Sequence, residues 1–132
     1  MGKPGLDGHS NGAEQIATRA ADIGLSVIYD GIRMTPDELV ERAANEQVHL
    51  LGLSILSGSH VPLVREVVAL TQPKWIVPCH WDTMVTPIDA PPDMLPGVDL
   101  PGFLREIEDA GVQALPVPLL GILTLPRGPF AR

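Results

Sequence analysis

The chain has 132 residues with a formal net charge of −7, and it contains one cysteine and fourteen prolines. This length suits one domain with a hydrophobic core, and the acidic balance without a cluster of lysines and arginines argues against nucleic acid as a partner. A lone cysteine excludes an intrachain disulfide, the N-terminus lacks a secretory pattern, and no apolar run reaches the ~18 residues of a membrane span. We therefore expect a cytoplasmic protein with no membrane partner.

The first half of the chain alternates helical and extended patterns. Apolar residues recur at helical spacing up to Gly24, which stands where a helix commonly ends. The run Thr35-Pro-Asp-Glu38 is a capping box with proline at the first helical position, so it opens a second helix. We expect helices over residues 13–23, 36–44 and 61–69, and strands over residues 25–29 and 48–54. This order predicts an α/β fold whose strands run parallel, and the apolar run 48–54 indicates a strand buried on both faces.

The second half differs in composition, because most of the prolines lie after residue 72. The run Trp75-Ile-Val77 is β-prone, and a helix near residues 102–110 is indicated by Asp99 or Leu100 as cap and by Gly111 at its end. Two further strands are expected over residues 114–117 and 120–125, with prolines confining the first to an edge or a bulge. Between these elements the prolines indicate a stiff connecting loop.

A glycine-rich loop, Lys3-Pro-Gly-Leu-Asp-Gly-His-Ser-Asn-Gly12, precedes the first expected helix. It places Asp7 two residues before His9. An aspartate that accepts a hydrogen bond from one imidazole nitrogen leaves the other nitrogen free to bind a metal. On its own the Asp-x-His pair more often marks a capped loop with a solvated histidine, because short motifs match frequently by chance. A second glycine-bearing loop, Ser57-Gly-Ser-His60, follows the expected strand 48–54.

Residues 2–70 resemble the cobalamin-binding domain of methylmalonyl-CoA mutase and related acyl-CoA mutases. The resemblance rests on the first glycine-rich loop, on Val27-Ile-Tyr29 with Thr35-Pro36, and on Gly52-Leu-Ser-Ile-Leu-Ser-Gly-Ser-His60. It implies a flavodoxin-like (Rossmann-like) parallel or mixed sheet flanked by helices, and a cobalamin cofactor such as adenosylcobalamin. His9 would be the lower axial ligand of cobalt and Asp7 its hydrogen-bond partner. The cofactor-binding residues implied are Asp7, Gly8, His9, Gly12, Ser54, Leu56 and Gly58, of which Ser54 and Leu56 line the pocket for the nucleotide tail.

Two departures from that family set further expectations. Only Met1 and Gly2 precede Lys3 where the family has a central strand, so we expect a sheet that lacks its usual first strand. Its place would then be filled from the second half, with Trp75-Ile-Val77 as the candidate, because a vacant central position would leave backbone groups unpaired. The Gly-Gly pair of a later family strand is also missing, which indicates an incomplete cobalamin site.

Residues 72–127 resemble the C-terminal end of metallo-β-lactamase-fold hydrolases, in which a strand delivers a late metal-ligating histidine. That residue would be His80. The paired histidines of a zinc hydrolase are missing, because the chain has only His9, His49, His60 and His80. We expect His49 to lie in the core and His60 at a helix start, and neighbours on an extended strand such as Cys79 and His80 cannot form a catalytic dyad. The chain thus reads as a fusion of two partial domains within one compact domain, residues 1–132.

The function that these patterns favour is cobalamin binding, as a domain or small subunit of an acyl-CoA mutase-like system. Such a part would have no activity alone, and its partner would be a large mutase subunit that holds the acyl-CoA. The alternative is a recombined α/β scaffold without a specific ligand, and a metal-dependent hydrolase is the weakest candidate. Exposed strand edges and the apolar run 119–125 also predict self-association, as a homodimer.

Overall fold

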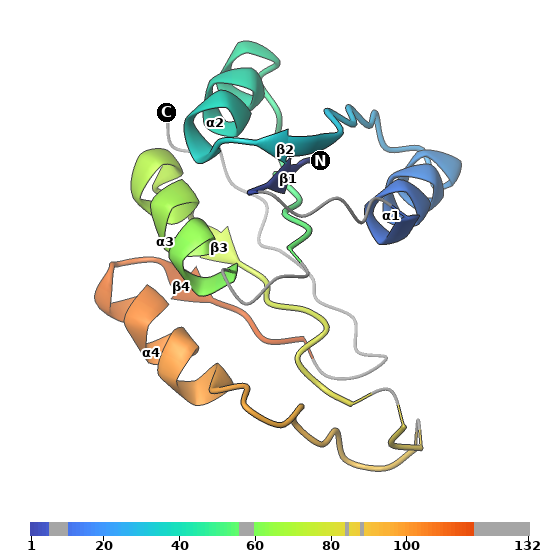
Figure 1. Ribbon diagram of the computed structural model, residues 1–132, viewed down its shortest axis with the longest axis vertical. Coiled ribbons are helices and arrows are strands. Elements are labelled where there is room, and N and C mark those ends of the chain that lie inside the picture. The colour runs from blue at the N-terminus through green and yellow to red at the C-terminus, as the bar shows by residue number, and fades with distance from the viewer. Residues whose placement is uncertain (6–10, 56–59, 84, 88, 118–132) are drawn as a thin grey trace. The chain divides into compact units, whose positions relative to one another are not determined.

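The computed structural model describes residues 1–5, 11–55, 60–83, 85–87 and 89–117. The chain divides into two compact units, Met1–Gln72 and Pro73–Arg132, and Figure 1 labels their elements. This boundary falls at the junction between the two segments that the sequence distinguishes, 2–70 and 72–127. The expectation that both belong to one domain stays a prediction.

The first unit contains the helices and strands that the local sequence signals indicate. Its elements are β1 (Lys3–Pro4), α1 (Asn11–Asp22), β2 (Ile32–Met34), α2 (Pro36–Asn45) and α3 (His60–Thr71). The capping box of α2 is confirmed, because Thr35 Oγ1 accepts from the Glu38 N–H at 3.2 Å and Glu38 Oε2 accepts from the Thr35 N–H at 2.8 Å. Gly24, with φ of +91°, follows the end of α1 as expected. His60 begins α3, which confirms its expected place at a helix start.

Residues 1–4 form the centre of the sheet in this unit. β1 runs parallel to β2, with Lys3 opposite Ile32, and on its other side Gly2 forms a parallel bridge to Leu53. The Gly2 N–H donates to Gly52 O at 3.1 Å and Gly2 O accepts from the Ser54 N–H at 3.2 Å. The sheet therefore has the order β2, β1, residues 52–54, which agrees with the central first strand of a flavodoxin-like sheet.

This arrangement corrects the expectation that the first strand is missing and that Trp75-Ile-Val77 takes its place. Four residues are enough to occupy the central position, because their backbone groups pair on both sides. The strand at Trp75, labelled β3, pairs instead with β4 of the second unit. The broader expectation of an α/β fold with parallel strands is confirmed.

The two strands expected at residues 25–29 and 48–54 are shifted or shortened. The Met1 ammonium donates to Ile28 O at 2.6 Å and the Asp30 N–H donates to Met1 O at 3.1 Å, which is the pattern of a parallel pair with Tyr29 opposite Met1. The regular strand begins only at Ile32, after Gly31 with φ of +86°. Both segments run in the direction of β1, as expected.

The prediction that residues 48–54 form a strand buried on both faces is wrong. Leu50 is 74% exposed and Val48 is 38% exposed. Among the described residues this run forms a bridge only at Leu53, where it pairs with Gly2, so its earlier residues have no strand beside them. His49 is exposed for the same reason and is not the core residue that we expected.

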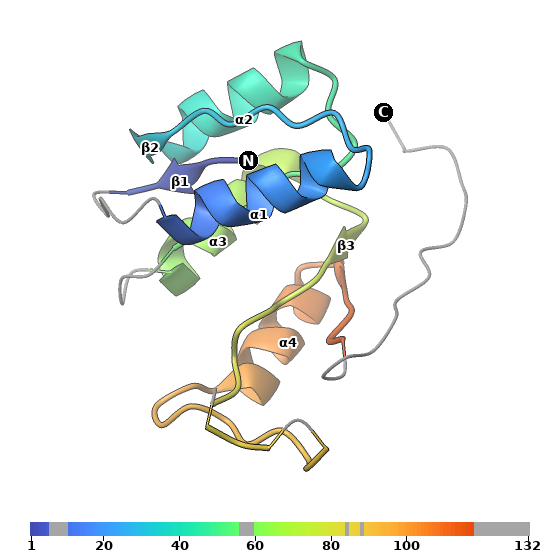
Figure 2. The ribbon, with the colours of Figure 1, turned by 90° about the vertical axis from the view of Figure 1, so that its right-hand side faces the viewer.

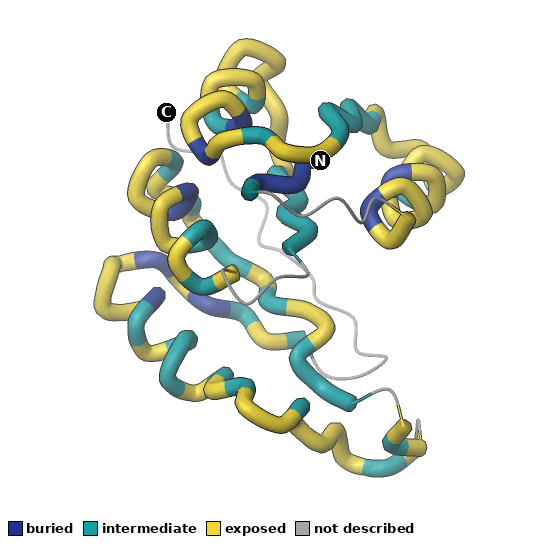
Figure 3. The backbone as a smooth tube through the Cα atoms, in the orientation of Figure 1, coloured by how far each residue is buried: buried dark blue, intermediate teal, exposed yellow. Residues whose placement is uncertain are grey.

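The core of the first unit lies between β1 and the helices. Figures 1 and 2 show α1 on one side of β1 and α2 on the other. The buried residues of this unit are Gly2, Lys3, Pro4, Ala13, Ala17, Pro36, Leu39, Val67 and Val68. Figure 3 draws buried positions in dark blue. Gly2 is part of this packing, because a Cβ there would lie 2.5 Å from Leu39 Cδ1.

The second unit is a strand, helix and strand whose two strands run parallel. Its elements are β3 (Trp75–Ile76), α4 (Leu100–Asp109) and β4 (Gln113–Ala114), with Trp75 opposite Gln113. Asp99 caps α4 through its Oδ1, which accepts from the Gly102 N–H at 2.8 Å. These elements match the expected strand, helix and following strand, whereas the expected strand 120–125 lies outside the described residues. None of the described helices is long and apolar enough to cross a bilayer.

Candidate cofactor site

Most of the expected cofactor residues lie in two short loops outside the described part of the chain. Asp7, Gly8 and His9 belong to residues 6–10, and Leu56 and Gly58 belong to residues 56–59. Gly12 and Ser54 are described. The structure therefore describes the strands and helices that precede and follow these two stretches of the chain.

The segments that lead into residues 6–10 and 56–59 end at the same edge of the sheet. Residues 6–10 follow β1 and residues 56–59 follow the segment that pairs with it, and the bridge between Gly2 and Leu53 is parallel. In a parallel sheet the carboxyl ends of neighbouring strands meet at one edge, where ligands of open α/β folds bind. The structure thus brings the starting points of the two predicted motifs together.

Gly5 anchors the first loop at this edge. Its N–H donates to Met34 O at 2.9 Å, and its φ of +88° is a conformation that suits glycine. A Cβ at this position would lie 3.0 Å from Leu63 Cδ1 of α3. The loop therefore begins at a defined position between β2 and α3.

Lys3 ties the second motif to β1. The lysine is 1% exposed, and its Nζ donates to Ser54 O at 3.1 Å and to Ser54 Oγ at 3.2 Å. A buried ammonium is costly unless hydrogen bonds replace its water. Sequence reasoning assigned no role to Lys3, although a lysine in the segment that ends a central strand is an unusual residue and could have drawn attention to it.

Gly12 lies in the first turn of α1, directly after residues 6–10, whereas Tyr29 lies beside Met1, where the strands begin. A Cβ on Gly12 would meet no atom of the described residues within 4 Å. The hydroxyl of Tyr29 is buried and has no hydrogen-bond partner among the residues that the structure describes. Burial, together with the nearby carboxylate of Glu14, raises the pKa of the Tyr29 phenol. Sequence reasoning used Tyr29 only as part of the run Val27-Ile-Tyr29, which contributes to the family resemblance, and assigned it no role in the site.

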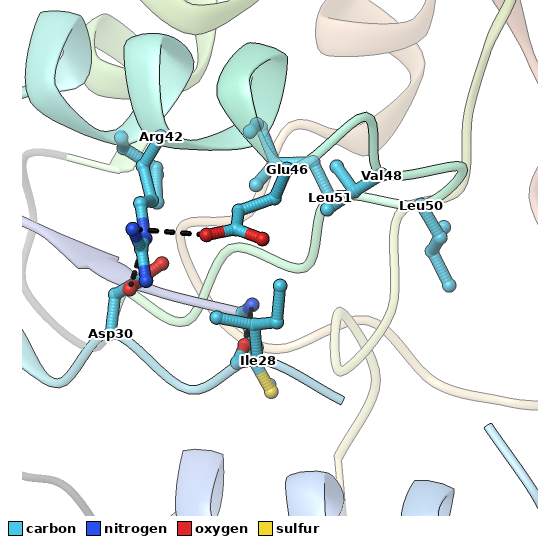
Figure 4. A pocket seen from close by; sticks show the side chains of 10 residues that line it. Ile28, Asp30, Arg42, Glu46, Val48, Leu50 and Leu51 are labelled. Carbon is cyan, nitrogen blue, oxygen red and sulfur yellow. Dashed lines mark hydrogen bonds and ion pairs between the residues drawn. The ribbon is translucent and has the colours of Figure 1, made fainter. Parts of the chain in front are cut away.

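A shallow hollow, open to solvent, lies at the opposite edge of the sheet (Figure 4). It is lined by apolar residues around Met1 and by Arg42, whose guanidinium pairs with Asp30 at 3.2 Å and with Glu46 at 3.0 Å. The strands begin here, at Met1 and Ile28, whereas both motif loops lie where the strands end. This hollow is therefore separate from the expected cofactor site.

The second unit provides no support for His80 as a metal ligand. His80 and Cys79 are both exposed, and across the described ranges no group of three or more His, Cys, Asp or Glu side chains could hold a metal ion. His80 has φ of +59°, so this segment is not an extended strand. The argument that Cys79 and His80 must point to opposite faces therefore does not apply to them.

The comparison with protein families places the first unit. The model of the family described as B12-binding domain matches residues 1–77, more than half of the chain. The chain belongs to the B12-binding domain family. The cofactor of this domain is cobalamin, and the resemblance of residues 2–70 is confirmed. The match ends at residue 77, so it gives no support to the resemblance of residues 72–127 to metallo-β-lactamase-fold hydrolases or to a fusion of two domains.

Similar proteins include several acyl-CoA mutases. Ethylmalonyl-CoA mutase of Cereibacter sphaeroides is 71% identical over 69 residues, which cover 52% of this chain and 11% of that protein. The 2-hydroxyisobutanoyl-CoA mutase small subunit of Aquincola tertiaricarbonis is 40% identical over 70 residues, covering 53% of this chain and 52% of the subunit. The mitochondrial methylmalonyl-CoA mutase of Mus musculus is 40% identical over 83 residues, covering 60% and 11%. The B12-binding domain of this chain is thus homologous to the cobalamin-binding regions of acyl-CoA mutases, and it spans about a tenth to a half of their lengths.

The described residues fit a cobalamin at the carboxyl edge of the sheet. The segments that lead into the two motifs end side by side, and a Cβ on Gly12 would meet no atom of the described residues within 4 Å. Both features suit a ligand that binds at this edge, beside the first turn of α1.

Proposed function

We propose that the chain binds a cobalamin such as adenosylcobalamin through His9. The supporting observation is that β1 and residues 52–54, which lead into the two motif loops, are adjacent parallel segments joined by the hydrogen bonds of Lys3 to Ser54. A cofactor held by both loops needs their starting points close together, and the sheet supplies that.

In this proposal each residue has a defined role. One imidazole nitrogen of His9 binds cobalt in place of the benzimidazole, and Asp7 accepts a hydrogen bond from the other nitrogen, which sets the tautomer and the orientation of the ring. Gly8 and Gly12 allow the backbone to approach the cofactor closely. Ser54, Leu56 and Gly58 line the pocket of the nucleotide tail.

The partner would be a large subunit or domain of an acyl-CoA mutase, and the chain alone would have no activity. A relative that covers a similar span of sequence is named as a mutase small subunit, which supports this division. The cofactor supplies homolysis of a cobalt–carbon bond, which begins a radical rearrangement. The residues of this chain bind and orient it, whereas the acyl-CoA would be held by the partner.

A visible-absorption titration with hydroxocobalamin tests the proposal. The wild-type spectrum should shift as histidine replaces benzimidazole on cobalt, and His9→Ala should lose this shift. His49→Ala is a matched control, because His49 is exposed near the opposite edge of the sheet, and it should titrate like wild type. Binding should weaken as the pH falls through the usual range of histidine titration, near 6.5, because only the neutral imidazole coordinates.

Two outcomes of this titration would overturn the proposal. One is a wild-type protein whose addition leaves the cobalamin spectrum unchanged at high protein concentration. The other is a His9→Ala variant that gives the same spectral shift as wild type. Either result would favour a scaffold that retains the B12-binding fold without its ligand.

A further inference from the structure

Arg33 lies inside β2 in a strained backbone conformation. Its φ is +64°, which is unfavourable for a residue with a Cβ. Gln47 and Gln72 also have positive φ, but they follow the ends of α2 and α3, where a residue in this conformation commonly ends a helix. Arg33 lies within a strand, so a helix end does not explain its conformation.

The strain at Arg33 belongs to a β-bulge. Lys3 and Pro4 are consecutive residues of β1, whereas their partners in β2 are Ile32 and Met34. Arg33 is therefore an extra residue that β1 does not match. Bulges are common next to active sites, where they redirect a side chain.

The bulge lies at the carboxyl edge of the sheet. β2 ends at Met34, whose carbonyl oxygen accepts a hydrogen bond from the Gly5 N–H at 2.9 Å, directly after the end of β1. Ligands of open α/β sheets bind at this edge. Arg33 is on one side of β1, and Ser54, which we propose lines the pocket of the nucleotide tail, is on the other. Arg33 is thus placed beside the part of the site that lies away from the tail.

The guanidinium of Arg33 can bind a ligand. The residue is exposed, and it has no ion pair or hydrogen bond with any residue that the structure describes. Two other arginines of the first unit, Arg19 and Arg42, pair with carboxylates. A guanidinium carries five N–H donors in a planar fork, which suits oxygen acceptors.

We propose that Arg33 binds the corrin ring of cobalamin by donating hydrogen bonds to the carbonyl oxygen of a propionamide side chain on the lower face of the ring. This inference rests on the proposed function, in which the lower face is turned toward the sheet. Neighbouring strands lie about 4.8 Å apart, and the corrin ring with its side chains is wider than that. A ring held over the end of β1 therefore extends over the end of β2. The bulge supplies a charged donor there at the cost of backbone strain, as is common at binding sites.

Substitutions of Arg33 separate this role from a structural one. Glycine suits a φ of +64°, so the melting temperature of unloaded Arg33→Gly should equal or exceed that of wild type. Its dissociation constant for hydroxocobalamin should rise about tenfold, the equivalent of one hydrogen bond from a charged donor. Arg33→Ala should show the same loss of affinity, because the loss comes from the side chain and not from a more flexible backbone.

Arg19→Ala is the matched control, since it removes an exposed arginine from the last turn of α1, and it should bind like wild type. Unchanged affinity in Arg33→Ala would overturn the inference. So would an Arg33→Gly protein that loses both stability and affinity. An arginine that only protects an edge strand from aggregation would leave the affinity for cobalamin unchanged.

Modified cobalamins identify the group that Arg33 contacts. Cobinamide lacks the phosphate and the nucleotide tail but keeps the propionamides, so Arg33→Ala should weaken its binding about tenfold as well. In the b-, d- and e-monocarboxylic acids of hydroxocobalamin, one lower-face propionamide is replaced by a carboxylate. The loss on Arg33→Ala should be larger for the acid whose carboxylate meets the guanidinium, because a bond between two charged groups is stronger.

Two results with these compounds would overturn the inference. One is a loss with hydroxocobalamin but none with cobinamide, which would assign Arg33 to the phosphate of the tail. The other is an equal loss for hydroxocobalamin and for all three acids. In both cases the wild type still binds cobalamin and the proposed function stands, whereas a wild type that binds none would overturn the proposed function together with the inference.

Discussion

The side-chain ammonium of Lys3 donates hydrogen bonds to both the carbonyl and the hydroxyl oxygen of Ser54, at 3.1 and 3.2 Å. The two residues are 51 positions apart in the chain and lie on adjacent parallel segments, each leading into a motif loop. Since Lys3 is only 1% exposed, its ammonium depends on these acceptors in place of water. The pair therefore links the two halves of the proposed cofactor site.

Replacing Lys3 by methionine should lower the free energy of unfolding by about 2 kcal/mol, the usual scale for a hydrogen-bonded buried charge. Methionine has a similar length and leaves both oxygens of Ser54 without these donors. The measurement is urea unfolding followed by circular dichroism. Lys74→Met is the matched control, since Lys74 is an exposed lysine over the ring of Trp75, and it should change stability by less than about 1 kcal/mol. Equal effects of the two variants would contradict the importance of the Lys3 contacts.

Two glycine substitutions should act in opposite directions. A Cβ on Gly2 would lie 2.5 Å from the buried Leu39 side chain, so Gly2→Ala should destabilise the protein by about 1–3 kcal/mol through overpacking. Gly12 lies in α1 with open space around it, so Gly12→Ala should stabilise the unloaded protein by about 0.5 kcal/mol. Thermal unfolding of both variants checks this. A Gly2→Ala protein as stable as wild type would show that Leu39 repacks without cost.

The capping box of α2 should make the folded protein lose stability as the pH becomes acidic. Hydrogen bonds from the backbone and side chain of Thr35 lower the pKa of Glu38 below its usual 4.5. Because the folded state favours the charged form, this stabilisation is present above the unfolded pKa and disappears as the pH falls through the lower folded pKa. Glu38→Gln has no charge to lose, so its melting temperature should fall less than that of wild type between about pH 5 and pH 3. Parallel curves for the two proteins would contradict this prediction.

Self-association is expected from the apolar residues exposed where the strands begin. Ile23 is 79% exposed and Leu50 is 74% exposed, and both precede segments that run beside β1. Covering such residues with a second copy would remove apolar surface from water. Sedimentation equilibrium at micromolar concentration should show a species heavier than the 14.1 kDa monomer, and Leu50→Asp should shift it toward the monomer. A single 14.1 kDa species for wild type would contradict the prediction.

The sequence by itself determined the helices and the family. The helix boundaries follow from contacts three or four residues apart, such as the Thr35 and Glu38 cap of α2, the Asp99 cap of α4 and the glycine after α1. These signals lie in residues that are close in sequence, so they can be recognised before the fold is known. The motif around Asp7 and His9 identified the B12-binding family in the same way.

Only the tertiary structure decided which segments lie side by side. Met1–Pro4 is too short to be recognised as a strand, yet it occupies the centre of the sheet because β2 and Leu53 supply backbone partners on both sides. Those partners lie about 30 and 50 residues away, and no local pattern encodes them. The same long-range pairing buries Lys3 against Ser54 and leaves Leu50 exposed. Burial and strand order depend on which distant neighbours meet, and that is decided when the chain folds.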